Sequence, residues 1–411
     1  MSFVLHNIRK IYTLEGALAK SGKWILPEDL SPILDASMVI TSQNKIAWVG
    51  RAADLPSKFR KLKKTNAQGQ VVLPAFIDSH THLVFAGDRS DEFEMRLAGK
   101  SYQEIAHAGG GITCSMQATR NASFAELFKL SLDRVENFLA QGVTTIEIKT
   151  GYGLDFESEL KCLKVIDALK KKSRAKIMAT FLAAHSLPPE FKGRHKEYVQ
   201  TLSFDWLPKL KKYCDFVDIF IDEGYFTESD AEILFSECKK YKIKTRVHAD
   251  ELGLTGGTAT AIKFQSLSAD HLLRITDKEV ASLSNSNVTA TLLPTTAFFL
   301  KTDCAPARDL LDAGARVALA TDFNPGTSPT QDISLVGILA ALHMRMRTEE
   351  IIAALTINGA FALGLEKSRG ALLPGYDASF IMTKGESLAE FFYHFGQRRK
   401  NIKVFSQGRF V

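Results

Sequence analysis

The stretch that most constrains the fold is residues 71–83, which read VVLPAFIDSHTHL. An unbroken apolar run of this kind predicts a strand buried on both faces, as in a parallel sheet covered by helices. Because successive side chains of a strand point to opposite faces, His80 and His82 should share one side while Thr81 faces away. A neutral imidazole binds zinc or a similar cation through one nitrogen. The stretch therefore predicts half of a metal site, against the alternative of two surface histidines in a turn.

Further apolar runs follow, and amphipathic stretches with a period near 3.6 residues lie between them. The runs are residues 143–151, 175–185, 214–224, 242–251, 264–271, 287–296 and 315–326. The helix-like stretches include residues 123–140, 157–171, 228–241 and 303–313. Eight strands with helical crossovers predict an α/β fold, a closed (β/α)8 barrel of the TIM type. An open doubly wound sheet is the alternative, but it usually carries a glycine-rich loop where this chain has His-x-His.

The two ends of the chain predict a second, smaller domain. Short β-like runs precede residue 71 and follow residue 364, and Pro374-Gly375 marks a turn between two of them. We therefore expect a discontinuous β-sandwich made of residues 1–70 and 365–411, into which a barrel of residues 71–364 is inserted. The aromatic stretch 388–395 is expected to pack internally or to form an oligomer contact.

Composition limits the class of protein. With 411 residues, of which 45% are apolar and 24% charged, the chain should be globular. It has no apolar run near 18 residues and no export signal at its start, which favours a cytoplasmic protein without a membrane partner. The net charge of +6 is modest, and the lysine clusters fall on expected helix faces, so we expect no nucleic-acid partner. A mildly positive field suits a small anionic substrate. The five scattered cysteines are expected to be free thiols.

Residues that bind metal or transfer protons follow nearly every predicted strand. In a parallel barrel the carboxyl ends of the strands form the catalytic face, so these residues should meet there. The seventh strand, ending in Pro294-Thr295-Thr296, contributes none. In strand order the others are Asp78, His80 and His82; Lys149 and Tyr152; His185; Asp222 and Glu223; His248 and Glu251; Asp270 and His271; and Asp322.

This pattern resembles the amidohydrolase superfamily of metal-dependent hydrolases, which bind metal through a His-x-His on the first barrel strand, a histidine on the fifth and an aspartate on the eighth. The resemblance implies the ligands His80, His82, His248 and Asp322. Three neutral imidazoles and one carboxylate leave a divalent ion at +1, so loss of one proton from bound water makes the site neutral. A bound ion lowers the pKa of water from 15.7 to about 7.

The position of Lys149 bears on the number of ions. Superfamily members with two metals use a carbamylated lysine at the end of the fourth strand, whereas Lys149 closes the second. We therefore expect one divalent ion per subunit, zinc or iron, with manganese also compatible with these ligands. Lys149 is then expected to be an ion-pair partner or a substrate contact.

Several longer motifs narrow the resemblance to the imidazolonepropionase family. They are LPAFIDSHTHLVFAGDR, HAGGGI, EIKTGYGL, FLAAHSLPPEF, HADE, SADHL and ATDFNPGTSPT. The resemblance implies hydrolysis of the lactam C–N bond of 4-imidazolone-5-propanoate to N-formimidoyl-L-glutamate in histidine degradation, by attack of a metal-bound hydroxide. It also implies a homodimer.

Substrate contacts follow from the same resemblance. It implies that Arg89, Tyr152 and His185 contact substrate. Arg89 is suited to hold the propionate carboxylate with two hydrogen bonds, unless it forms a loop salt bridge with Asp88 or Asp91. Two loops are also expected at the site: the turn with Asn324, Gly326 and Thr327, whose alternative is a tight turn alone, and a flexible loop at Gly109–Gly111.

Proton transfer is the least determined part. We expect the ion, with His271 or His185, to stabilise the developing oxyanion. Glu251 is expected first as a substrate contact and second as general base, and Asp322 as the carrier of a proton to the departing nitrogen. A deaminase of a cyclic base would use the same ligands, but Arg89 and the NPGTSP loop argue against it. A non-catalytic scaffold would generally have lost metal ligands, and all four are present.

Overall fold

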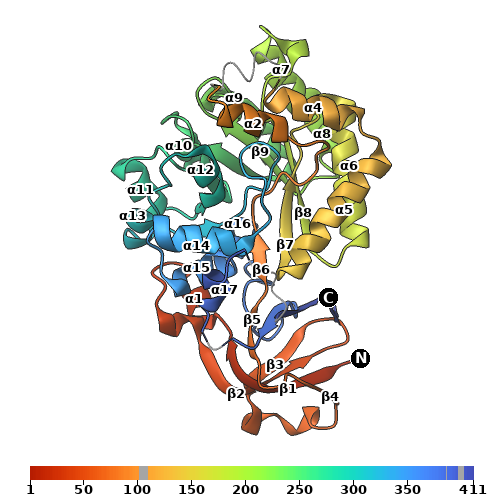
Figure 1. The fold of residues 1–411 in the computed structure, drawn as a ribbon, viewed down its shortest axis with the longest axis vertical. Coiled ribbons are helices and arrows are strands. Elements are labelled where there is room, and N and C mark those ends of the chain that lie inside the picture. Colours follow the sequence, from red (N-terminus) through yellow and green to blue (C-terminus); the bar gives the residue numbers. More distant parts are fainter. Residues whose placement is uncertain (101–109, 386, 397–401) are drawn as a thin grey trace.

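The computed structural model describes residues 1–100, 110–385, 387–396 and 402–411. Figure 1 shows two layers of unequal size: a barrel of parallel strands with helices around it, and beneath it a mixed sheet that holds both chain ends. The predicted α/β class and the predicted pairing of the two ends are confirmed.

The barrel strands pair in chain order, each parallel to the next. At the carboxyl ends the first and last strands meet, because Thr81 lies in a parallel bridge with Phe323 and the backbone N–H of His82 donates to the Phe323 carbonyl at 2.9 Å. The predicted (β/α)8 barrel is therefore confirmed. Its strands are β6 (Phe76–Asp78), β7 (Val143–Lys149), β8 (Lys176–Ala184), β9 (Phe216–Ile221), β10 (Lys244–Ala249), β11 (Ser268–His271), β12 (Thr289–Leu292) and β13 (Val317–Leu319).

The helices around the barrel begin where the sequence carries capping residues. Ser123 and Asp155 each accept a backbone hydrogen bond at the start of a long helix. The helix predicted at residues 303–313 is shorter, because Pro306 precedes its first turn. No helix of the described residues is both long and apolar enough to cross a membrane.

The larger helices on the barrel are α2 (Ser90–Leu97), α4 (Ile112–Asn121), α5 (Phe124–Ala140), α6 (Phe156–Lys172), α9 (Glu228–Tyr241), α11 (Asp277–Ser284) and α14 (Ile333–His343). Shorter ones are α1 (Glu15–Ala19), α7 (His195–Thr201), α8 (Leu207–Leu210), α10 (Gly257–Lys263), α12 (Pro294–Leu300), α13 (Ala307–Asp312), α15 (Thr348–Ala354), α16 (Ile357–Ala362) and α17 (Glu390–Tyr393).

The smaller layer joins the two ends of the chain through hydrogen bonds. Strand β5 pairs parallel with β1 and antiparallel with β14, which places the C-terminal strands beside the N-terminal ones. The expected sandwich thus takes the form of a mixed sheet. Its strands are β1 (Phe3–Tyr12), β2 (Pro32–Ile40), β3 (Ile46–Arg51), β4 (Lys63–Asn66), β5 (Val71–Pro74), β14 (Phe380–Thr383), β15 (Ile402–Ser406) and β16 (Arg409–Phe410).

The prediction of a single strand over residues 71–83 is wrong. Residues 71–74 belong to the mixed sheet, and only residues 76–78 belong to the barrel. The change occurs at Ala75, whose N–H donates to the Ser379 carbonyl, while the next N–H, of Phe76, donates to the Gly142 carbonyl of the barrel. Both short strands are buried, so one apolar run in the sequence covers two sheets. The histidines follow the barrel strand on extended chain.

Candidate functional site

Four of the predicted side chains converge at the carboxyl end of the barrel. They are His80 and His82 beyond β6, His248 on β10 and Asp322 beyond β13, and each is at most 3% exposed. The Nε2 atoms of His82 and His248 are 3.4 Å apart, and Oδ1 of Asp322 lies 3.4 Å from Nε2 of both His80 and His82. Ligand atoms bonded to a tetrahedral ion at about 2.0 to 2.1 Å are about 3.4 Å apart. The spacing fits one ion.

The atoms that face this point are not satisfied by the protein. Among the described residues, Nε2 of His80 and Oδ1 of Asp322 are buried without a hydrogen-bond partner. Buried polar atoms are rarely left so. The described residues contain two sets of three side chains whose ligand atoms all lie within 4.8 Å of one another. One set is His80, His82 and His248, and the other is His80, His271 and Asp322. The cluster is therefore a potential metal site, and His271 lies close to it.

Two carboxylates orient the histidines. Nδ1 of His80 lies 2.7 Å from Oδ2 of Asp270, and Nδ1 of His248 lies 3.0 Å from Oδ2 of Asp218. Because a carboxylate accepts hydrogen bonds, the hydrogen of His80 belongs on Nδ1 and its lone pair on Nε2, which is the tautomer that binds metal. His248 lies within ion-pair distance of Asp218, and this contact favours the same tautomer. Burial, with Lys149 nearby, holds the pKa of His80 well below its usual value. The imidazole is therefore neutral, as a ligand must be.

Asp322 is held in an unfavourable backbone conformation. Its φ is 52°, and that of His271 is 78°. Residues other than glycine rarely adopt such values, and those that do cluster at active sites. Asp322 is fixed by its N–H, which donates to the His80 carbonyl at 3.0 Å, and by Oδ2, which accepts from Oγ1 of Thr296 at 2.6 Å. Thr296 follows the seventh barrel strand, from which we expected no contribution. It was missed because a threonine neither titrates nor commonly binds metal.

A cavity of about 420 Å³ opens above this cluster. Most of the residues predicted at the site line it, together with apolar and acidic neighbours that the sequence did not single out as substrate contacts. The predicted ones are His82, Arg89, Tyr152, His185, His248, Glu251, His271, Asp322, Asn324 and Thr327, and the others are Ile112, Phe220, Glu223, Tyr225, Leu252 and Leu300.

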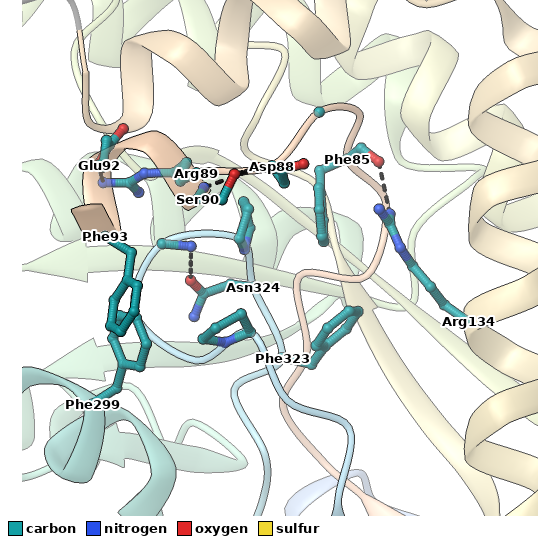
Figure 2. A pocket seen from close by; sticks show the side chains of 14 residues that line it. Phe85, Asp88, Arg89, Ser90, Glu92, Phe93, Arg134, Phe299, Phe323 and Asn324 are labelled. Carbon is teal, nitrogen blue, oxygen red and sulfur yellow. Dashed lines mark hydrogen bonds and ion pairs between the residues drawn. The ribbon is translucent and has the colours of Figure 1, made fainter. Parts of the chain in front are cut away.

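Arg89 lies in the wall between this cavity and a neighbouring one of about 450 Å³. Figure 2 shows its guanidinium beside Glu92, to which Nη2 donates at 2.6 Å. The salt bridge within this loop is therefore made with Glu92, and not with Asp88 or Asp91 as the alternative supposed. Gly326 lines the neighbouring cavity and leaves room for the Arg89 guanidinium, because a Cβ at this position would lie 1.9 Å from Nη1.

The loop after Asp322 is a tight turn held by Asn324. Its Oδ1 accepts from the backbone N–H of Gly326 at 2.8 Å (Figure 2). The same oxygen accepts from the N–H of Thr327 at 2.8 Å, and Nδ2 donates to the Asp322 carbonyl at 2.6 Å. The alternative of a structural turn is thus correct for the conformation of this loop. Asn324 and Thr327 nevertheless border the cavity.

Glu251 faces the cavity from the loop after β10. Asp222 holds this loop, because its Oδ2 accepts from the N–H groups of Glu251 and Leu252, both at 2.8 Å. Oε1 of Glu251 lies 3.5 Å from Nδ1 of His271. Burial, with the charges of Asp322 and Asp222, raises the pKa of Glu251 to about 8. In the metal-free protein the neutral form of this carboxyl group is therefore favoured at neutral pH.

His185 and Tyr152 form the opposite wall. Nδ1 of His185 lies 3.1 Å from the Gly151 carbonyl, and its ring stacks on His82 with centroids 4.9 Å apart. Burial lowers the pKa of His185 to about 3 and raises that of Tyr152. Gly151 is required here, since its φ is 110° and a Cβ would lie 2.7 Å from the Leu182 carbonyl oxygen.

The remaining expectations concern Lys149 and the glycine-rich segment. Lys149 is an ion-pair partner, with Nζ 2.9 Å from Oε1 of Glu147 and 2.8 Å from Oδ2 of Asp218, and it lies below the cavity.

In the segment Gly109–Gly111, Gly109 lies outside the described residues. The N–H of Gly111 donates to Oε1 of Glu92 at 2.7 Å.

Comparison with known proteins agrees with this geometry. Residues 71–411 match the model of the amidohydrolase family. Over its whole length the chain is 45% identical to the imidazolonepropionase of Bdellovibrio bacteriovorus, covering 97% of that protein. It is 40% identical to the imidazolonepropionase of Porphyromonas gingivalis, over 96% of this chain and 94% of that one.

Solved structures show the same fold. An adenosine deaminase from Xanthomonas campestris with bound zinc aligns with a TM-score of 0.71 at 14% identity, over 99% of this chain and 92% of that one. The ochratoxinase of A. niger aligns with a TM-score of 0.71 at 17% identity, over 100% of this chain and 95% of that one. The family match and the identity to the curated relatives both span most of the chain, so it belongs to the amidohydrolase family and, within it, to the imidazolonepropionases.

Proposed function

We propose that the chain hydrolyses the lactam C–N bond of 4-imidazolone-5-propanoate, giving N-formimidoyl-L-glutamate in histidine degradation. The observation that carries this proposal is the meeting of a metal-fitting cluster and one arginine at a single cavity of about 420 Å³. A small cyclic amide with one carboxylate matches both features. The relatives named imidazolonepropionase support the choice of substrate.

One divalent ion, zinc or iron, is held in this proposal by His80, His82, His248 and Asp322. The 3.4 Å spacing of their facing atoms supports a single ion. Lys149 points away into an ion pair, which argues against a lysine bridging two ions. When bound, such an ion supplies a water nucleophile at neutral pH, because it lowers the pKa of water from 15.7 to about 7.

The substrate is oriented by Arg89 and Tyr152. The Arg89 guanidinium lines the cavity and pairs with Glu92 through Nη2, and a planar guanidinium is the group that suits the propionate carboxylate. The raised pKa of Tyr152 keeps its hydroxyl protonated, so it donates a hydrogen bond to the substrate. In this proposal the lactam ring lies over the histidine cluster.

His271 is the better of the two candidates for the oxyanion. The Gly151 carbonyl can only accept, so the hydrogen of neutral His185 lies on Nδ1 and its Nε2 carries a lone pair. His185 therefore accepts a hydrogen bond from a ring N–H. His271 is left to stabilise the developing charge on the carbonyl oxygen through a hydrogen on Nε2, and its Nδ1 then carries a lone pair, 3.5 Å from Oε1 of Glu251.

Glu251 and Asp322 move the protons. Hydrolysis bonds the water oxygen to the carbonyl carbon, breaks the C–N bond and gives a proton to the departing nitrogen. Asp322 takes a proton from the attacking water and carries it to that nitrogen. Glu251, which lines the cavity, is in this proposal first a contact of the substrate ring and only second a general base.

The test measures bound metal and the loss of imidazolonepropionate absorbance for wild type and Asp322→Ala. About one ion per wild-type chain, with hydrolysis lost in the variant, would support the proposal. If wild type held metal but left this substrate intact while deaminating a cyclic base, the metal site would stand and the role of Arg89 would be wrong. Light scattering on the same sample tests the homodimer that the resemblance implies.

A further inference from the structure

Five charged side chains are buried inside the barrel, beneath the proposed metal site. Glu147, Lys149, Asp218, Arg246 and Asp270 are all fully buried. They come from β7, β9, β10 and β11. The interior of such a barrel is usually filled by branched apolar side chains. Burying ion pairs is costly and often stabilises less than apolar packing does, so a function other than stability should account for them.

These side chains form a continuous network. Nζ of Lys149 lies 2.9 Å from Oε1 of Glu147, 2.8 Å from Oδ2 of Asp218 and 3.9 Å from Oδ2 of Asp270. Nη2 of Arg246 lies 2.8 Å from the same Oδ2 of Asp270 and also donates to the Ser79 carbonyl. Lys149 is thus within ion-pair distance of both aspartates, which lie on different strands.

Each of these aspartates also contacts a proposed metal ligand. Oδ2 of Asp218, the atom paired with Lys149, is 3.0 Å from Nδ1 of His248. Oδ2 of Asp270, the atom paired with Arg246, is 2.7 Å from Nδ1 of His80. In each aspartate, Oδ2 is thus contacted by a cation on the side away from the metal site and by a histidine ring on the side facing it. Three carboxylates and two cations also leave one negative charge beneath a site for a divalent ion.

We propose that Lys149 is a positioning residue for the metal site. Its ammonium group holds Asp218 in place at 2.8 Å, while Asp270, 3.9 Å away, is held by Arg246. The two aspartates hold His248 and His80 with their Nε2 atoms converging. The inference rests on the proposed metal site and extends it to a residue that touches neither the metal nor the substrate.

The test is the metal affinity of Lys149→Met, measured with the metal-free protein by competition for Co²⁺ against a chelator. Methionine keeps an unbranched side chain that is one atom shorter, and it removes the charge. Loss of groups that orient metal ligands typically costs about 10- to 100-fold in affinity, and we expect a loss of that size. The visible spectrum of bound Co²⁺ should also change, since it reports ligand geometry.

Lys161→Met is the matched control. Its ammonium group is also fully engaged, donating to the carbonyls of Thr119, Arg120 and Ala122 at 3.0, 2.8 and 2.7 Å, but it lies on α6 outside the barrel. It should bind Co²⁺ like wild type, with the same spectrum. If Lys149→Met binds Co²⁺ as tightly as Lys161→Met and with an unchanged spectrum, the inference is overturned. If wild type itself binds no metal, the proposed function fails first.

A second pair of variants keeps the inference testable should Lys149→Met not fold. Asp218→Asn and Asp270→Asn each remove one carboxylate from a different histidine. Lys149 pairs closely with Asp218 alone, at 2.8 Å, whereas Arg246 pairs with Asp270. Lys149→Gln should therefore cost less affinity in the Asp218→Asn background than it costs in wild type, while in the Asp270→Asn background its cost should stay the same. An equal loss in all three backgrounds would mean that Lys149 does not act through Asp218.

Discussion

If Arg89 binds the substrate carboxylate as proposed, it should affect substrate affinity rather than the rate of the chemical step. It reaches the cavity from a loop, away from the cluster of His80, His82, His248 and Asp322. Arg89→Lys keeps the charge but removes the planar fork. We expect KM to rise about 10- to 100-fold, the equivalent of about 1.4 to 2.8 kcal/mol, with a much smaller change in kcat.

Steady-state kinetics with imidazolonepropionate measure the separate changes in KM and kcat. An imidazolone without the propionate arm serves as the control substrate. On that control, wild type and Arg89→Lys should perform alike. A fall in kcat with KM unchanged would mean that Arg89 acts on the reacting bond and does not bind the carboxylate.

Glu251 gives the metal-free protein a pH-dependent stability. Its pKa rises from an ordinary value of 4.5 to about 8 on folding, so the folded state holds the proton more tightly. The resulting stabilisation is complete below pH 4.5 and is lost as pH rises to about 8, at about 1.4 kcal/mol per pKa unit. Glu251→Gln cannot ionise. Relative to wild type, it should therefore become more stable between pH 5 and pH 9, as measured by urea unfolding in the presence of a chelator. If the difference in unfolding free energy between Glu251→Gln and wild type stays constant from pH 5 to pH 9, Glu251 is already ionised in the folded protein over this range.

At the scale of elements, helix α2 connects the substrate arginine to the glycine-rich segment. One carboxylate of this helix, Glu92, accepts from Arg89 through Oε2 and from the Gly111 N–H through Oε1. Glu92→Gln keeps the shape but loses the charge and one acceptor. We expect KM to rise about tenfold, the effect of losing roughly one charge-assisted hydrogen bond, because Arg89 is then less well held.

Glu94→Gln is the matched control, since Glu94 lies on the same helix and is exposed. Its kinetic constants should stay within twofold of those of wild type, as is usual for exposed positions. Equal KM values for the two variants would mean that Glu92 does not position Arg89.

The strands show where sequence patterns suffice and where they do not. Residues 143–149 and 176–184 are buried strands within the predicted runs. The run at residues 71–83 looks the same in sequence yet is divided at Ala75 between two sheets. Burial makes a strand apolar whichever sheet it joins, so the pattern cannot show which partners it pairs with.

At the scale of the whole molecule, the bound ion should contribute to stability. It would join residues from β6, β10 and β13, which are far apart in the chain. A ligand present at a thousand times its dissociation constant adds about 4 kcal/mol, which for a chain of this length corresponds to about 5 °C in Tm. Calorimetry before and after chelation measures this shift. Asp322→Ala should show little or no change in Tm on chelation. An equal shift in the variant would mean that the metal is held elsewhere.

The sequence by itself determined the fold class and the identity of the proposed ligands. Periodicity and burial are local properties, and the spacing of His80 and His82 fixes their common direction whatever surrounds them. Resemblance then supplied His248 and Asp322.

Only the tertiary structure decided how these residues are supported. Three contacts illustrate this: Thr296 with Asp322, Glu92 with Arg89, and Lys149 with two aspartates. The partners are either far apart in the sequence or are polar residues that no motif distinguishes from their neighbours. A side chain's type states which bonds it is able to make. Which bond it does make depends on the distance and burial that the folded chain imposes.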